Sequence, residues 1–416
     1  MLSVRLAHYY CCILAIVTFP WPISGHAQEL PHAQHPLNLR PIDWSRLLSL
    51  HRALVEIESI SGNEYKVGEY LHSYLTAHNF TVERQHVDPL AADAESSRFN
   101  LLAYSGDKHS ARVLLSSHID TVPPYWPYEN REHDQIWGRG SVDAKGCVAT
   151  QIQAVEELLA AGEIAGRDVA LLFVVGEEIG GDGMRKANDL GLSWETVIFG
   201  EPTELKLASG HKGSLGFNIK ATGKAGHSGY PWLGENANSM LIPALVALDR
   251  LELPSSKKYG STTLNIGKME GGVAGNVIAE TAKAQIQIRI ADGSAEKIKD
   301  IVVDTITKVD ARLELNFLSK GYGPVDIDTD VEGSKSFNHY SKSPTVCGNL
   351  RLHLLGFDTI VVNYGTDIPN LYGDYKKYLY GPGNILVAHS DHEHLVEDDL
   401  FAAVEGYKKL VLAALA

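Results

Sequence analysis

Cysteine is scarce in this sequence, and half of it lies at the N-terminal end. Four cysteines occur in 416 residues, and two of them, Cys11 and Cys12, fall within the first 27 residues. The remaining pair, Cys147 and Cys347, is too few for a disulfide scaffold, so the fold must rest on a hydrophobic core. One disulfide between these two and a pair of buried free thiols both agree with the sequence.

Clusters of basic residues are also missing. The chain has 37 Lys and Arg residues against 51 Asp and Glu residues, which gives a formal net charge of −14. An acidic chain without a basic cluster is a poor partner for nucleic acid or for an anionic membrane surface, because both attract positive charge. We therefore expect no nucleic acid and no membrane as partners, and small molecules and cations instead.

The N-terminal apolar stretch is too short for a membrane span. Arg5 gives the first residues a positive charge, residues 9–22 are almost wholly apolar, and Gly25-His26-Ala27 offers small residues for signal-peptide cleavage. A span needs ~20 apolar residues, so residues 1–27 are interpreted as a signal peptide. A buried N-terminal helix and a signal anchor are the alternatives.

Secretion follows from this interpretation as an expectation. The sequence Asn79-Phe80-Thr81 is an N-glycosylation sequon, which agrees with a secreted protein. A three-residue match also arises by chance, so glycosylation of Asn79 is weak support on its own.

Three short apolar runs are the clearest structural signal. They cover Arg112 to His118, Val169 to Val175 and Thr196 to Phe199, and they alternate with helical periodicity such as that of Ala144 to Ala161. Such runs are typical of buried strands, so the sequence predicts an α/β domain with a mostly parallel sheet. Ligands of such sheets bind beyond the carboxyl ends of the strands.

A second pattern lies between residues 213 and 322. Strand-like alternation, for example over Ala282 to Ile290, is combined there with helical stretches at Asn236 to Leu251 and Ala295 to Val309. At 416 residues the chain is also too long for one core. We predict a smaller inserted α+β domain over residues 213–322. The larger domain then consists of two parts, residues 28–212 and 323–416.

Further elements are expected near the C-terminus. Asp358 to Tyr364 is predicted to form a strand, and Glu393 to Ala416 to form the closing helix. Between them His389 follows another apolar run.

Polar residues at the ends of the runs are the candidates for chemistry. His118 and Asp120 lie two residues apart, so in extended chain their side chains point the same way and Asp120 can orient the imidazole. Glu177 and Glu178 follow the second run, and Glu201 follows the third. Adjacent acids at a buried strand end are costly without cations that compensate their charge.

Asp143 lies in the glycine-rich turn from Gly138 to Gly146, directly before a predicted helix. An aspartate there is also a good helix N-cap, and capping alone is the competing interpretation. Two histidines and several carboxylates together are nevertheless the ligand set of a catalytic zinc pair, in which one carboxylate bridges two cations roughly 3.5 Å apart. A further carboxylate must stay off the metals to accept a proton.

The order of these motifs resembles the aminoacylase, acetylornithine deacetylase and glutamate carboxypeptidase family of metallopeptidases. The matching motifs are Ser117-His118-Ile119-Asp120-Thr121-Val122-Pro123, Gly140-Ser141-Val142-Asp143-Ala144-Lys145-Gly146, Gly176-Glu177-Glu178, Gly200-Glu201-Pro202-Thr203, Gly226-His227-Ser228, Gly271-Gly272-Val273-Ala274-Gly275-Asn276-Val277-Ile278 and Ala388-His389. The match extends from about Arg46 to the C-terminal helix, and motifs in a shared order are far more specific than any one alone.

The resemblance implies two zinc ions per subunit. Asp143 would bridge them. His118 and Glu201 would complete one site, and Glu178 and His389 would complete the other.

The resemblance also implies roles for residues off the metals. Glu177 would be the general base, and Asp120 would hold His118. The inserted domain would be a lid and dimerisation domain, in which His227 reaches the partner subunit's site in dimeric members; a loop histidine that only packs is the alternative. Asn276 and Arg289 would hold the substrate's carboxylate, although Arg289 also fits an exposed strand position.

The expected activity follows from the resemblance together with secretion. A secreted member meets peptides, so we expect a zinc metallo-carboxypeptidase that removes C-terminal residues, with a homodimer through the lid domain. The alternative is an N-acyl-amino-acid deacylase of the aminoacylase or acetylornithine deacetylase type, which uses the same metals and base. An inactive homologue acting as a binding protein would lack a ligand or the base, and all six positions are filled here.

Overall fold

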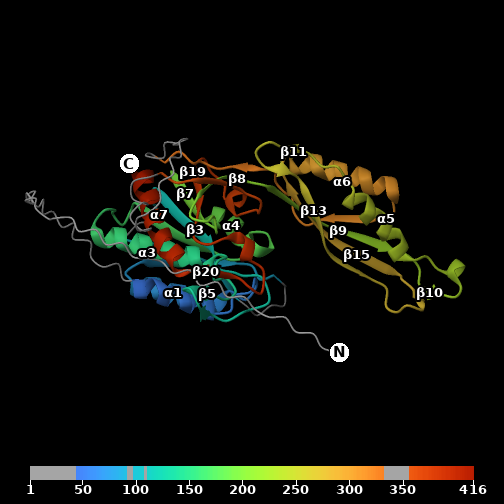
Figure 1. Cartoon of the computed structure of the whole chain (residues 1–416), viewed down its shortest axis with the longest axis horizontal. Coiled ribbons are helices and arrows are strands. Elements are labelled where there is room, and N and C mark those ends of the chain that lie inside the picture. The colour runs from blue at the N-terminus through green and yellow to red at the C-terminus, as the bar shows by residue number, and fades with distance from the viewer. Residues whose placement is uncertain (1–43, 91–96, 107–109, 332–355) are drawn as a thin grey trace, which may run out of the picture. The chain divides into compact units, whose positions relative to one another are not determined.

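The computed structural model describes residues 44–90, 97–106, 110–331 and 356–416 (Figure 1). The predicted signal peptide and Cys347 lie outside the described residues, so these two predictions stay untested. None of the helices in the described ranges is long and apolar enough to cross a membrane.

The central sheet has six strands and confirms the prediction of an α/β domain. Its strand order is β1 (Thr81–Val87), β2 (Arg98–Tyr104), β6 (Val169–Val174), β3 (Val113–His118), β7 (Thr196–Gly200) and β19 (Lys376–Tyr380). β3 pairs in parallel with β6 and β7, and β7 pairs in parallel with β19. β1 and β2 add an antiparallel edge to the sheet. The three predicted apolar runs are therefore neighbouring parallel strands, and all their strand residues are buried.

Helices cover this sheet because its strands are apolar on both faces. Along β3, Val113 and Leu115 belong to one buried core while Leu114 belongs to another, as expected when successive side chains alternate across a sheet. The first core also holds residues of four helices. These are α1 (Trp44–Glu56), α2 (Tyr65–Ala77), α3 (Lys145–Ala161) and α7 (Glu397–Leu415). The short helix α4 (Asp182–Ala187) contributes Met184 to the second core.

The inserted domain has a separate antiparallel sheet with its own core. The strand order is β13 (Thr263–Gly271), β15 (Thr281–Ile290), β9 (Gly213–Thr222) and β16 (Glu314–Phe317). The helices α5 (Ala237–Asp249) and α6 (Ala295–Val309) pack on it and share the core with Phe217 and Ile286. Residues of this core all lie between Leu215 and Phe317. The exact domain boundaries stay predictions.

The remaining strands form smaller sheets of two or three strands each. They are β17 (Val325–Asp326), β8 (Leu207–His211) and β18 (Thr359–Val362); β20 (His394–Val396), β5 (Gln135–Trp137) and β4 (Glu129–Arg131); β10 (Gly226–His227) with β14 (Val277–Ile278); and β11 (Ser255–Ser256) with β12 (Gly260–Ser261). The strand predicted over Asp358 to Tyr364 is thus β18, outside the central sheet. The closing helix begins at Glu397 and not at Glu393, because residues 394–396 pair with β5.

A buried arginine ties strand β2 to the N-terminal ends of two helices. Arg98 donates to both carboxylate oxygens of Glu64, at 2.9 and 3.0 Å, and to Asp182 at 2.7 Å. The side chains of Arg98 and Glu64 are fully buried. Removing the cation therefore leaves a buried carboxylate without its partner.

Replacing Arg98 with methionine is expected to lower the free energy of unfolding by about 3–5 kcal/mol, because an uncompensated buried charge remains. The measurement is urea-induced unfolding at fixed metal concentration. The control is Arg112→Met, which breaks the exposed Arg112–Glu195 pair and should cost less than about 1 kcal/mol. Equal losses in the two variants would show that the Arg98 network contributes no more than a surface ion pair.

Candidate metal centre

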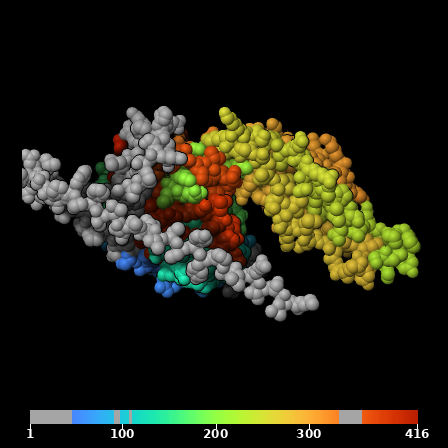
Figure 2. All heavy atoms as spheres, viewed as in Figure 1, coloured from blue at the N-terminus to red at the C-terminus, as the bar shows by residue number. Residues whose placement is uncertain are grey.

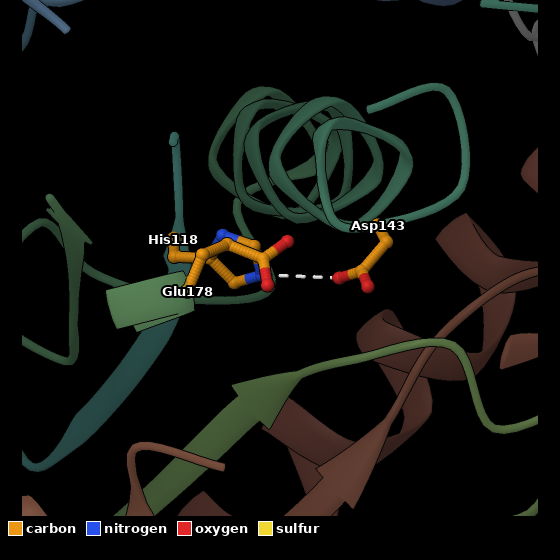
Figure 3. A group of neighbouring side chains, drawn as sticks. All are labelled: His118, Asp143 and Glu178. Carbon is orange, nitrogen blue, oxygen red and sulfur yellow. Dashed lines mark hydrogen bonds and ion pairs between the residues drawn. The ribbon is translucent and has the colours of Figure 1, made fainter. Parts of the chain in front are cut away.

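Asp143 lies between two histidines that come from distant parts of the chain. Its Oδ1 is 3.1 Å from His118 Nε2, and its Oδ2 is 3.3 Å from His389 Nε2. Glu178 Oε2 lies 3.0 Å from the same nitrogen of His389. Figure 3 shows the side chains of His118, Asp143 and Glu178 turned toward one another, and each offers an atom within 4.8 Å of the others. This geometry fits a carboxylate that bridges two cations.

The parallel strands place most of this cluster. His118 is the last residue of β3, and Glu201 directly follows β7. Glu177 and Glu178 begin the short 3₁₀ helix η1 (Glu177–Ile179), two residues after the end of β6. Since β3 is the parallel neighbour of β6 and β7, these residues meet at one edge of the sheet. Glu201 is buried, and its Oε1 lies 3.9 Å from His118 Nε2.

The two remaining cluster residues, Asp143 and His389, lie in turns and not at strand ends. Asp143 does not cap helix α3: the N-cap residue is Ala144, and no side chain caps the helix there. The Asp143 carboxylate contacts the two imidazoles instead. The apolar run before His389 forms the short 3₁₀ helix η5 (Ile385–Val387), and His389 has a positive φ of 62°, which a single residue adopts in a tight turn.

Burial and crowding of negative charge dominate the electrostatics. Burial raises the pKa of Glu177, Glu178 and Glu201, and a neighbouring carboxylate raises each further: Glu201 acts on Glu177, and Asp143 acts on the other two. Contacts with Asp143 and Glu178 raise the pKa of His389 to about 10. Buried carboxylates of this kind are stabilised by cations, and imidazole and carboxylate are the ligands that zinc prefers. The donor set therefore fits a metal centre.

Asp120 contacts His118, as predicted, and also the backbone of the two adjacent glutamates. Its carboxylate lies 3.5 Å from His118 Nδ1, while the Asp120 carbonyl oxygen is closer to that nitrogen, at 3.0 Å. The carboxylate also accepts from Glu177 N at 3.0 Å, from Glu178 N at 3.2 Å and from Ser61 Oγ at 2.7 Å. Asp120 thus links the histidine to the turn that carries the two glutamates.

One buried acid beside the cluster was missed. Asp367 accepts from Asn370 Nδ2 at 3.0 Å, and its Oδ2 is buried without a hydrogen-bond partner among the described residues. Burial raises its pKa to about 6, and its charge raises the pKa of Glu177. The available signal was its place shortly after the predicted strand that became β18, the same pattern that identified Glu201.

The residues predicted in the inserted domain do not form one cluster. His227 and Asn276 are exposed neighbours, since His227 pairs with Val277, the residue after Asn276, between β10 and β14. The segment of β10, yellow-green in Figure 2, lies at one end of the inserted domain. Arg289 lies near the other end of β15, eight residues beyond Thr281. At about 3.4 Å per residue, this part of the strand spans roughly 27 Å. One chain therefore does not bring Asn276 and Arg289 to the same carboxylate.

Asn79 and Cys147 both lie in the catalytic domain. Asn79 is exposed between α2 and β1, and glycosylation there stays a prediction. Cys147 is buried on α3 and forms no disulfide with a cysteine of the described ranges, and burial raises the pKa of its thiol. It behaves as a packing residue in the part of the chain that the structure describes.

Two family models match the chain. The peptidase dimerisation domain matches residues 209–314, and peptidase family M28 matches residues 100–190, which contain His118, Asp143 and the two adjacent glutamates. Among solved structures, an M20 family metallo-carboxypeptidase from Sulfolobus solfataricus has a TM-score of 0.68 at 18% identity, over 89% of this chain and 99% of that one. A tripeptidase from Staphylococcus aureus also has a TM-score of 0.68, at 21% identity, over 90% of this chain and 100% of that one.

Sequence relatives are much more similar. A probable carboxypeptidase of Aspergillus oryzae is 46% identical over 407 residues, which cover 90% of this chain and 89% of that protein. A probable carboxypeptidase of Emericella nidulans is 44% identical, with 95% and 94% covered. The chain belongs to the M20 peptidase family. The resemblance inferred from the motifs is confirmed.

As an M20 peptidase, the protein is a metal-dependent hydrolase with a catalytic α/β domain and an inserted lid domain. The matched dimerisation domain covers most of the inserted sheet, from β9 to the start of β16. The role of each individual site residue stays a prediction.

Proposed function

We propose that this M20 peptidase is a secreted, zinc-dependent metallo-carboxypeptidase that hydrolyses the C-terminal peptide bond of peptides. The observation that carries the proposal is the Asp143 carboxylate, which contacts a different imidazole with each oxygen. Relatives over 40% identical along most of their length are named probable carboxypeptidases, which supports this choice of bond.

The proposed zinc ligands divide into two sets that share Asp143. His118 and Glu201 would complete one set, and Glu178 and His389 the other. When bound, zinc lowers the pKa of a coordinated water and polarises the scissile carbonyl group.

Glu177 is proposed to move the proton. Its backbone N–H is fixed by Asp120, and its carboxylate stands among buried acids that favour uptake of a proton. Glu177 accepts one proton from the attacking water and donates it to the nitrogen of the leaving amine. The water oxygen then ends in the new carboxyl group of the shortened peptide, and the C–N bond is broken.

Substrate recognition is proposed to involve two subunits. The Arg289 guanidinium can form two parallel hydrogen bonds to the substrate's terminal carboxylate. Asn276 and His227 lie beyond the opposite end of β15, at the small sheet of β10 and β14, so they would act on the site of a second copy. The match to the dimerisation domain supports a homodimer of this kind.

Secretion remains part of the proposal. It is supported by the N-terminal pattern of residues 1–27 and by the exposed sequon at Asn79. Extracellular peptides would then be the available substrates.

The proposal predicts cleavage of peptides that have a free C-terminus, and resistance of the same peptides when the C-terminus is amidated. Zinc-loaded protein should be assayed on matched panels of peptides, amidated peptides and N-acetyl amino acids. Activity confined to the N-acetyl series would favour a deacylase and contradict the carboxypeptidase proposal.

Arg289→Ala is expected to raise KM for peptides by about 10–100-fold, because a hydrogen-bonded charged group contributes about 1.5–3 kcal/mol. The control is Arg250→Ala, which removes an exposed arginine from the same domain. An unchanged KM in the Arg289 variant would remove this residue from carboxylate recognition.

A further inference from the structure

Glu393 is a buried carboxylate that holds the turn carrying Asp143. Its Oε1 accepts from Gly140 N at 2.8 Å and from Val142 N and Asp143 N at 3.4 Å each. Its Oε2 accepts from Arg139 Nη1, and both side chains of this ion pair are 2% exposed. One acid therefore accepts from three backbone N–H groups of this turn, at residues 140, 142 and 143, and from the side chain of Arg139.

Glu393 also belongs to the segment that carries the second histidine. It lies four residues after His389 and directly before β20. Its carbonyl oxygen accepts from Gly138 N at 3.3 Å, and the next residue, His394, pairs with Trp137. The segment of His389 and the turn of Asp143 are thus joined by backbone pairing and by this one side chain.

Arg139 is itself fixed from the other side. Its Nε donates to Pro124 O at 3.1 Å, and its backbone N donates to Trp126 O at 3.0 Å. The loop that follows His118 therefore contacts the same ion pair. A buried ion pair with this many hydrogen-bond partners can fix the conformation of the surrounding turn, because each group has few alternative positions.

We propose that Glu393 is the positioning residue of the metal centre: it fixes the Asp143 turn against the His389 segment, so that the two oxygens of Asp143 face the two imidazoles. This inference rests on the proposed function, because it assumes that Asp143 and His389 bind metal. Glu393 acts through Asp143 and not on the substrate. Loss of a group that orients metal ligands typically lowers metal affinity by 10–100-fold.

The test compares two double variants that both remove the buried charges. Arg139→Met/Glu393→Gln keeps an amide oxygen that can accept from Gly140 N, whereas Arg139→Met/Glu393→Ala keeps no acceptor. Removing both charges together avoids an unpaired buried arginine, which would destabilise the fold. Circular dichroism and thermal unfolding show that both variants are folded before the comparison is made.

Zinc affinity is then measured by competition with a chromophoric chelator, without substrate. The Gln variant is expected to stay within about threefold of the wild type, and the Ala variant to lose about 10–100-fold. Equal zinc affinities of the two double variants would overturn the proposal. The control Asp391→Asn changes an exposed acid of the same segment and should bind zinc as the wild type does.

Steady-state kinetics distinguish a residue that positions the metal ligands from one that binds the substrate. At saturating zinc, the Ala variant should show a lower kcat with an unchanged KM. A raised KM with an unchanged kcat would contradict the role. A wild type that binds zinc but cleaves no peptide would contradict the proposed function instead, so the two failures are distinguishable.

Discussion

Glu177→Gln is expected to lower kcat by about 10²–10⁴-fold, the usual contribution of a positioned general base, while the zinc content stays that of the wild type. Glutamine keeps the size of the side chain but neither accepts the proton of the water nor returns it to the amine. Asp120 contacts only the backbone N–H of this residue, so the turn should keep its geometry. The measurement is steady-state kinetics beside metal analysis of the same preparation.

The control for this variant is Glu163→Gln, which neutralises an exposed acid at the end of helix α3. It should keep both activity and zinc. If Glu177→Gln binds zinc fully and retains full activity, Glu177 is not the base and another acid, such as Asp367, must be examined.

Asp143→Ala is expected to have the largest effect on metal binding, because this carboxylate is assigned to both ions. Zinc affinity should fall by more than about 100-fold at both sites, since even groups that only orient metal ligands contribute 10–100-fold. Peptide hydrolysis should fall to the level of chelator-treated wild type. Isothermal titration of the metal-free protein with zinc measures the affinity.

The matched control is Asp189→Ala, which removes an exposed aspartate from a surface ion pair with Lys186. It should bind zinc as the wild type does. An Asp143 variant that still binds both ions and hydrolyses peptides would show that the contacts with the two imidazoles have no metal-binding role.

The sequence predicted the buried parallel strands because their apolar character is continuous. It did not predict β2, which begins with Arg98 and contains Asn100, although every residue of this strand is buried. Both polar side chains find partners far away in sequence: Arg98 contacts Glu64 and Asp182, and Asn100 donates to Gly183 O. Such compensation depends on tertiary contacts, which no local pattern contains.

The candidate site shows the same limit. His118, Glu178 and Glu201 could be predicted because each lies at or just past the end of an apolar strand, and His389 was identified through the family motif. Glu393 was expected at the start of a helix, yet it contacts Gly140, 253 residues away in sequence. Its role depends on a pairing that only the folded chain creates.

The pairing of Asn276 with Arg289 illustrates a different limit. The motifs assign both residues to one carboxylate, and the length of β15 separates them within one chain. The order of the motifs therefore predicts that these residues bind the substrate, but it does not predict whether both come from the same subunit.

The most direct test of the account is a crystal structure of the zinc-loaded protein with anomalous data collected at the zinc absorption edge. We predict two anomalous peaks on either side of the Asp143 carboxylate, one beside His118 and Glu201 and the other beside Glu178 and His389. Peaks that lie away from Asp143, or hydrolysis of peptides by crystals without any zinc peak, would contradict it.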